Sequence, residues 1–278
     1  GTDIRYCWPA LMPNSPVTPG EDEDTFYDSY SQEWKRALPY YYAGKGLLVD
    51  TDRVEDIDRL VSWPDTEGSH WMAGVADRAR QLHDEQYYFV TMRMVASHGP
   101  FQTACDLRGT ENFLMDMVLN TEFAETLLDR ATDVVTGLLT SAMKTAGQYF
   151  DMIELPGDDY AGNTSTIISP AMFNKFIKPR IARMVTAIRE INPGIKIMLH
   201  SDGAITSLLP DLLELGIDVL HPLEPLPATD LPRVKQEFGS KFTFLGGIDI
   251  SHAMPASRDD VINETRLRIS QLAAGGGY

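Results

Sequence analysis

From about residue 87 onward, short apolar runs alternate with longer stretches in which apolar residues recur every three or four positions. The short runs are apolar throughout, which is typical of parallel strands buried on both faces. They predict strands at 87–95, 150–155, 195–200, 217–225 and 241–249. The longer stretches predict helices at 169–191, 204–216, 231–239 and 257–273, and two helices within 110–148 that meet near Asn120.

Local signals support several of these boundaries. Ser169 is a favourable N-cap, and Pro170 fits the first helical position behind it. Gly216 and Gly239 follow the last periodic residue of their helices and are expected to end them. Earlier in the chain, residues 47–60 predict a short strand and then an amphipathic helix that stops before Trp63.

The first part of the chain lacks such periodicity. Residues 8–40 are expected to be irregular, because they contain Pro9, Pro13, Pro16 and Pro19 and the acidic run 21–24. We therefore predict an N-terminal extension over 1–45 that wraps a core domain over 46–278. The chain begins without methionine and stops at a glycine run where a further strand is expected, so we expect trimming at the start and truncation beyond Tyr278.

Alternation of strands and helices predicts an α/β fold with a parallel sheet, either a (β/α)8 TIM barrel or an open doubly wound sheet. Polar residues follow nearly every predicted strand, which favours the barrel, because its sites lie at the C-terminal ends of many strands. No GxGxxG motif follows a first strand, which weakens the dinucleotide-binding alternative. The fold prediction is a TIM barrel with an irregular N-terminal extension.

Composition and charge argue against several classes of binding partner and indicate a cellular location. The formal net charge of −16 over 278 residues argues against nucleic acid and mildly against a polyanionic small substrate. No apolar stretch is long enough for a membrane span. The two cysteines, Cys7 and Cys105, exclude a disulfide framework, and no signal peptide is evident, so a cytoplasmic location is expected.

Polar residues after the predicted strands are the candidates for chemistry. Asp158 and Asp159 are adjacent carboxyls, so one could have its pKa raised by the other and serve as a proton donor; alternatively they brace the loop. Tyr160 beside them is a candidate hydrogen-bond donor to substrate. The candidates for substrate binding are His98, Asp249 and the pair Gly246 and Gly247, whose backbone can approach a ligand closely.

Four ordered blocks of sequence resemble the uroporphyrinogen decarboxylase superfamily, which includes decarboxylases and the methyltransferases of corrinoid pathways. This resemblance implies a TIM barrel with its site at the C-terminal mouth. The decarboxylases hold their substrate with an arginine-rich N-terminal segment, whereas the first 35 residues here contain only Arg5 and Lys35 as bases. The chain therefore looks closer to the methyltransferase branch. The blocks are HGPFQTACDLRG (98–109), GDDYAGNTSTIISPAMFNKFIKPRI (157–181), IKIMLHSDGAITSLLPDLLELGIDVLHPLEP (195–225) and FLGGID (244–249).

The resemblance also implies a metal site. In the methyltransferase branch a strand ends in His-x-Cys, and this chain has His200-Ser201-Asp202 at that place. A related barrel, cobalamin-independent methionine synthase, adds a glutamate about two dozen residues later, where this chain has Glu224. His200, Asp202 and Glu224 are thus the predicted ligands of zinc, and their oxygen-rich set also suits iron or manganese. A purely structural pairing of His200 with Asp202 is the alternative.

Three functions follow from these observations. The first is metal-dependent methyl transfer between a small-molecule donor and a corrinoid, carried by a partner protein, or a thiol. The second is a cofactor-free decarboxylase of the uroporphyrinogen type. The third is a non-catalytic protein that binds a tetrapyrrole or corrinoid, which the polar strand ends argue against, because a pure binding pocket is mostly apolar.

Overall fold

A computed structural model describes residues 3–38 and 40–278 of the chain. The chain divides into two compact units, which are described one at a time. The N-terminal unit contains residues 1–157 and 179–195, and the C-terminal unit contains residues 158–178 and 196–278. None of the helices in the described ranges is long and apolar enough to cross a membrane.

The N-terminal unit has three parallel strands in the order β1-β6-β7. The strands are β1 (Ile4–Cys7), β6 (Phe89–Met92) and β7 (Met152–Leu155). All four residues of β7 are buried, as expected for a strand covered on both faces. The strands predicted at 87–95 and 150–155 are therefore confirmed with shorter bounds, and Ile4–Cys7 adds a strand that the sequence did not predict.

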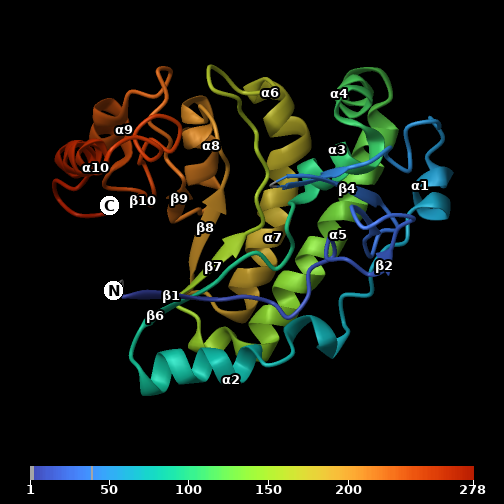
Figure 1. Cartoon of the computed structure of the whole chain (residues 1–278), viewed down its shortest axis with the longest axis horizontal. Helices are drawn as coiled ribbons and strands as arrows, with labels where there is room; N and C mark the ends of the chain where they lie inside the picture. The colour runs from blue at the N-terminus through green and yellow to red at the C-terminus, as the bar shows by residue number, and fades with distance from the viewer. Residues whose placement is uncertain (1–2, 39) are drawn as a thin grey trace. The chain divides into compact units, whose positions relative to one another are not determined.

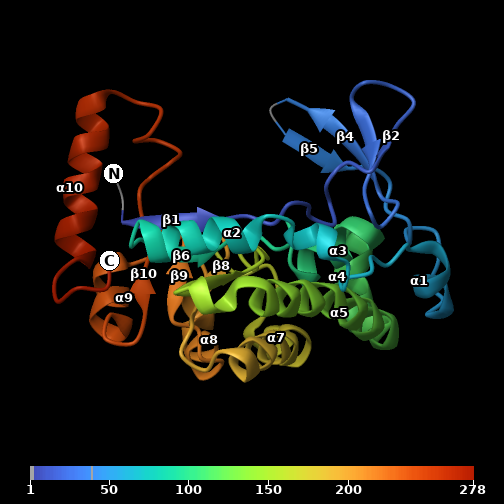
Figure 2. The same cartoon turned by 90° about the horizontal axis from the view of Figure 1, so that it is seen from below.

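Helices pack around these strands, and the longest is α5 (Thr121–Ala146), with 13 buried residues. It follows α4 (Thr110–Leu119) directly, so the two helices predicted to meet near Asn120 are confirmed. Arg180 of α7 (Lys178–Ile191) donates to Asp129 of α5 at 3.0 Å, and Figures 1 and 2 show the two helices side by side. The remaining helices of this unit are α1 (Glu55–Leu60), η1 (Ser69–Met72), α2 (Val75–Arg80), η2 (Gln81–Glu85), α3 (Pro100–Arg108) and η3 (Gly147–Tyr149).

A second, antiparallel sheet lies in the region predicted to be irregular. Its strands are β2 (Thr18–Pro19), β3 (Thr25–Tyr27), β4 (Glu33–Ala37) and β5 (Tyr40–Ala43), in the order β2-β3-β4-β5. Figure 2 shows it as a layer distinct from the parallel strands β1 and β6 of the same unit. Residues 8–40 therefore contain more order than the sequence indicates, although irregular stretches separate the short strands.

Residues 47–50 do not form the predicted strand. They form a turn, in which the backbone N–H of Leu48 donates to the carbonyl of Leu107 and that of Val49 to the carbonyl of Gly46. Leu48 is fully buried, so its apolar character reflects core packing rather than strand pairing. The helix predicted after it is confirmed as α1.

The C-terminal unit continues the strand–helix alternation. Its parallel strands are β8 (Lys196–His200), β9 (Val219–His221) and β10 (Thr243–Phe244), in the order β8-β9-β10. Figure 1 shows them beside the helices that follow each one. Those helices are η5 (Thr206–Leu208) with α8 (Leu209–Glu214), α9 (Leu231–Phe238) and α10 (Arg258–Leu272), and the short helices α6 (Pro170–Met172) and η4 (Phe173–Ile177) precede β8.

Helix ends in this unit follow the predicted chemistry. The Ser169 hydroxyl accepts from the backbone N–H of Met172, as the N-cap prediction requires. Gly216 ends the α8 segment with φ +76°, a conformation that suits glycine. The sequence signals therefore located both of these helix ends correctly.

Candidate active site

Two histidines end neighbouring strands of the C-terminal unit. His200 of β8 and His221 of β9 are register partners, and their Nδ1 atoms lie 2.8 Å apart. One Nδ1 must donate and the other accept. If both rings are neutral, the donor has a bare Nε2, and this nitrogen can bind a metal or accept a proton.

Asp202 lies two residues after His200, just beyond the end of β8, and strand alternation predicts that side chains at this spacing share a side. Ligand atoms of Asp159, His200 and Asp202 all lie within 4.8 Å of one another. Asp159 is held there because its Oδ1 accepts the backbone N–H of Asp202 at 2.8 Å. One nitrogen and two carboxylate oxygens at this spacing can hold a divalent cation.

Glu224, the third ligand predicted from the sequence, is used differently. Its Oε2 accepts the backbone N–H of Gly203. Among the described residues, no group of three with ligand atoms within 4.8 Å of one another includes Glu224. The structure thus brings His200 and Asp202 together as predicted, with Asp159 rather than Glu224 as the third member.

The carboxylates of Asp159, Asp202 and Glu224 lie close enough to influence one another electrostatically. Burial raises the pKa of Asp202, the nearby Asp159 carboxylate raises it further, and Glu224 adds to the effect, whereas His200 lowers it. In the described part of the chain, no lysine or arginine forms an ion pair with any of the three carboxylates. A bound divalent cation would relieve their mutual repulsion.

Asp158 and Tyr160 have a different environment from Asp159. Both side chains are buried, and the Tyr160 hydroxyl donates to Asp158 Oδ2 at 3.1 Å. Burial, followed by the Asp158 charge, raises the pKa of Tyr160, so the phenol stays protonated. Asp159 is therefore the aspartate of the pair that reaches the metal-capable group, and the catalytic roles of Asp158 and Tyr160 stay predictions.

Three hydrogen bonds tie the loop at 158–162 to the turn at 201–204. The N–H of Tyr160 donates to Ser201 Oγ at 3.1 Å, that of Asp202 to Asp159 Oδ1, and that of Ala204 to the Gly162 carbonyl at 2.9 Å. The sequence analysis assigned no role to the fully buried Ser201 or to His221. A histidine at the end of each of two apolar runs, KIMLH and VLH, was the available signal for His221.

Gly246 and Gly247, the glycines predicted to face a ligand, pack closely against other residues of this chain. Gly246 has φ +99°, and a Cβ there would lie 2.9 Å from Pro222 Cβ. At Gly247, with φ +81°, a Cβ would lie 3.3 Å from a Leu272 methyl. Backbone conformation and packing account for both glycines, and a ligand contact there stays a prediction.

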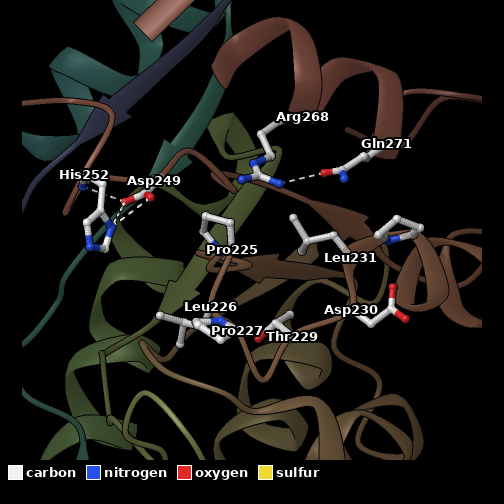
Figure 3. A pocket seen from close by; sticks show the side chains of 11 residues that line it. Pro225, Leu226, Pro227, Thr229, Asp230, Leu231, Asp249, His252, Arg268 and Gln271 are labelled. Atoms are coloured by element: carbon white, nitrogen blue, oxygen red, sulfur yellow. Dashed lines mark hydrogen bonds and ion pairs between the residues drawn. The ribbon is translucent and has the colours of Figure 1, made fainter. Parts of the chain in front are cut away.

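Asp249 lines a cavity of about 400 Å³ in the C-terminal unit. Figure 3 shows its carboxylate bound to His252 on one side of the cavity, with Arg268 and Gln271 paired on the other. The backbone N–H of His252 also donates to Asp249, and this bond is the main reason that the pKa of Asp249 is lowered. Asp249 is thus an anchored carboxylate, and its substrate-binding role stays a prediction.

His98, the remaining candidate, belongs to the N-terminal unit. Its Nδ1 lies 2.7 Å from Asp106 Oδ2, which fixes the ring orientation. The ring centroid lies 5.6 Å from that of Trp34, and both residues line a cavity of about 280 Å³. This lining position is compatible with the binding role of His98, which stays a prediction.

Comparison with known proteins shows which family this chain matches. Residues 45–278 match the family model "Uroporphyrinogen decarboxylase (URO-D)". A "methyltransferase from Methanosarcina mazei" has a similar structure, with a TM-score of 0.66 and 16% identity over 89% of this chain and 68% of the other. Xylanase B from Clostridium stercorarium F9 aligns with a TM-score of 0.38 and 13% identity over 73% of this chain and 67% of the other. A search of curated proteins found no significant match.

These findings confirm the predicted fold class, because the parallel strand–helix alternation and the similarity to the Methanosarcina protein are those of a TIM-barrel-like fold. The family model covers most of the chain, including every residue of the metal-capable group. The chain belongs to the uroporphyrinogen decarboxylase family.

Proposed function

We propose that this member of the family is a metal-dependent methyltransferase that acts on a small-molecule methyl donor. Asp159, His200 and Asp202 would hold a divalent ion, and the observation that carries the proposal is their mutual approach within 4.8 Å. A nitrogen with two carboxylate oxygens suits zinc and is also compatible with iron or manganese. The fold similarity to a methyltransferase supports the reaction class.

The metal would supply a Lewis acid that polarises the heteroatom bearing the methyl group. The remaining tasks fall to this chain's residues. His221 would orient His200 through the Nδ1 hydrogen bond, as outer-shell partners of ligating histidines do. The Asp202 N–H holds the Asp159 carboxylate in place, and Ser201 anchors the backbone at Tyr160. The methyl acceptor would be a corrinoid on a partner protein or a thiol.

Metal binding is tested by titrating zinc into the apo protein in a calorimeter. Asp159→Asn, His200→Ala and Asp202→Asn should each weaken binding by roughly 100-fold, and His221→Ala by about 10–100-fold. Asp249→Asn is the matched control, because it removes a carboxylate of the same unit outside the group, and it should leave zinc affinity unchanged. A larger loss in Glu224→Gln than in Asp159→Asn would restore the ligand set predicted from the sequence.

Methyl transfer is tested with the zinc-loaded protein, a panel of methyl ethers and methylamines, and cob(I)alamin as acceptor. The appearance of methylcobalamin, followed by its absorbance, should depend on zinc and be lost in His200→Ala. Consumption of uroporphyrinogen by the metal-free protein would instead establish the decarboxylase alternative. Tight corrinoid binding without turnover would establish the non-catalytic alternative.

A further inference from the structure

Four ring side chains gather on one wall of the 280 Å³ cavity in the N-terminal unit. Phe26 of β3 stacks with Trp34 of β4 at a centroid distance of 6.4 Å, and Tyr41 of β5 meets Phe26 edge to face at 5.2 Å. His98 continues the row beyond Trp34. All four residues line the cavity, so it presents an aromatic wall built largely from the small antiparallel sheet.

Carboxylates stand behind this wall rather than within the cavity. Trp34 Nε1 donates to Asp28 Oδ2 at 2.7 Å, and His98 Nδ1 pairs with Asp106. Neither aspartate lines the cavity, and no lysine or arginine does. A ring N–H bound to a carboxylate is polarised so that the ring becomes richer in electrons, which strengthens attraction of a cation to its face.

Asp28 is itself nearly fully buried. Burial raises its pKa to about 6, against the hydrogen bonds from Trp34 and the backbone that lower it. The carboxyl is therefore ionised at pH 7.5, and it carries a negative charge in a poorly solvated place. A cation in the adjoining cavity would stabilise that charge.

We propose that this cavity binds a small organic cation that carries N-methyl groups. The methylated nitrogen would lie against the faces of Phe26, Trp34 and Tyr41, as in aromatic cages for quaternary ammonium groups. This inference goes beyond the proposed methyl transfer, because it needs neither the metal nor a methyl acceptor.

Choline is the probe, since it carries three N-methyl groups and one hydroxyl. Its neutral isostere 3,3-dimethylbutan-1-ol has the same shape and hydroxyl without the charge. Calorimetric titration of the full chain at pH 7.5 in EDTA and low salt should give choline an affinity at least about tenfold higher than the isostere. Equal affinities would show an apolar pocket only and overturn the proposal, as would no choline binding at 50 mM.

Neighbouring tyrosines of β5 supply a matched pair of variants. Tyr41 lines the cavity, whereas Tyr42 does not, and both side chains are about half exposed, so either can be replaced with little risk to folding. Tyr41→Leu should weaken choline binding at least fivefold and Tyr42→Leu should leave it unchanged, with circular dichroism confirming that both fold. Equal effects of the two variants would place the binding elsewhere and overturn the proposal. Because the titration is metal-free, its outcome is independent of the zinc and methyl-transfer tests.

Discussion

Replacing Gly203 by alanine tests whether the two loops of the candidate site are locked by close backbone contact. Gly203 has φ +91°, and a Cβ added there would lie 2.3 Å from the Ala161 carbonyl oxygen and 2.6 Å from its carbon. Both atoms are backbone, so no side-chain rotation relieves the contact. Gly216 is the matched control, because it has φ +76° in the same unit and an added Cβ there meets nothing within 4 Å.

The comparison separates two costs. A non-glycine residue in the left-handed region costs about 1–2 kcal/mol, and Gly216→Ala should show only this term. Gly203→Ala adds an overpacking cost of about 1–3 kcal/mol, because the loop at Ala161 must move. At roughly 2–4 °C per kcal/mol for a protein of this size, Gly203→Ala should melt about 2–12 °C below Gly216→Ala.

Differential scanning fluorimetry and urea unfolding measure the stability difference, and zinc titration measures its effect on the site. Displacement of Gly203 moves Asp202 away from Asp159, so zinc affinity should fall in Gly203→Ala and stay at the wild-type value in Gly216→Ala. Equal melting temperatures in the two variants would refute the claim that the loops are in close contact. Unchanged zinc affinity in Gly203→Ala would refute the claim that this contact positions Asp202.

Other predictions concern buried polar groups, each measured by urea unfolding. Because the pKa of Asp28 rises from 3.8 to about 6 on folding, the folded state holds this proton more tightly, so stability should fall by about 3 kcal/mol between pH 3 and 7, with about 2 kcal/mol of this loss between pH 4 and 6. Asp28→Asn should remove that pH dependence, and an unchanged profile would contradict the assignment. Tyr160→Phe removes a hydrogen-bond donor to buried Asp158 and should cost about 1–3 kcal/mol; a neutral effect would show that this bond contributes nothing. Arg93→Met leaves the buried Glu154 carboxylate without its bidentate partner and should cost about 3–5 kcal/mol. The double variant Arg93→Met/Glu154→Leu should recover most of that loss, and failure to recover would argue against an ion-pair origin.

The repeating part of the fold could be predicted because its signals are local. Helical periodicity, the Ser169 cap and apolar runs each occupy a few consecutive residues, and the family resemblance ordered them into a barrel. The strands β2 to β5 carry no such signal, because each is two to five residues long and depends on pairing such as Thr25 with Lys35. Leu48 shows the converse error, since an apolar run near a turn can be core packing without a strand.

The site could be predicted only where side-chain direction follows from a strand. His200 ends β8 and Asp202 lies two residues later, the spacing at which strand side chains share a side, and their ligand atoms do approach within 4.8 Å. Glu224 and Asp159 lie beyond the regular part of their strands, where loop hydrogen bonds decide the direction. The Gly203 N–H donates to the Glu224 carboxylate, and the Asp202 N–H donates to the Asp159 carboxylate. Neither hydrogen bond can be predicted from the pattern of residue types.

Strand β5 also has a consequence for how this protein behaves when concentrated. It is the last strand of its ladder, so one row of its backbone groups has no neighbouring strand in the described sheet, and Tyr40, Tyr41 and Tyr42 are 65%, 48% and 57% exposed. Such an edge is a template for intermolecular strand addition. The net charge of −16 keeps copies apart, but its range shrinks from about 10 Å at 0.1 M salt to about 3 Å at 1 M. Colloidal stability should therefore fall as salt is added, and Tyr42→Lys should restore it.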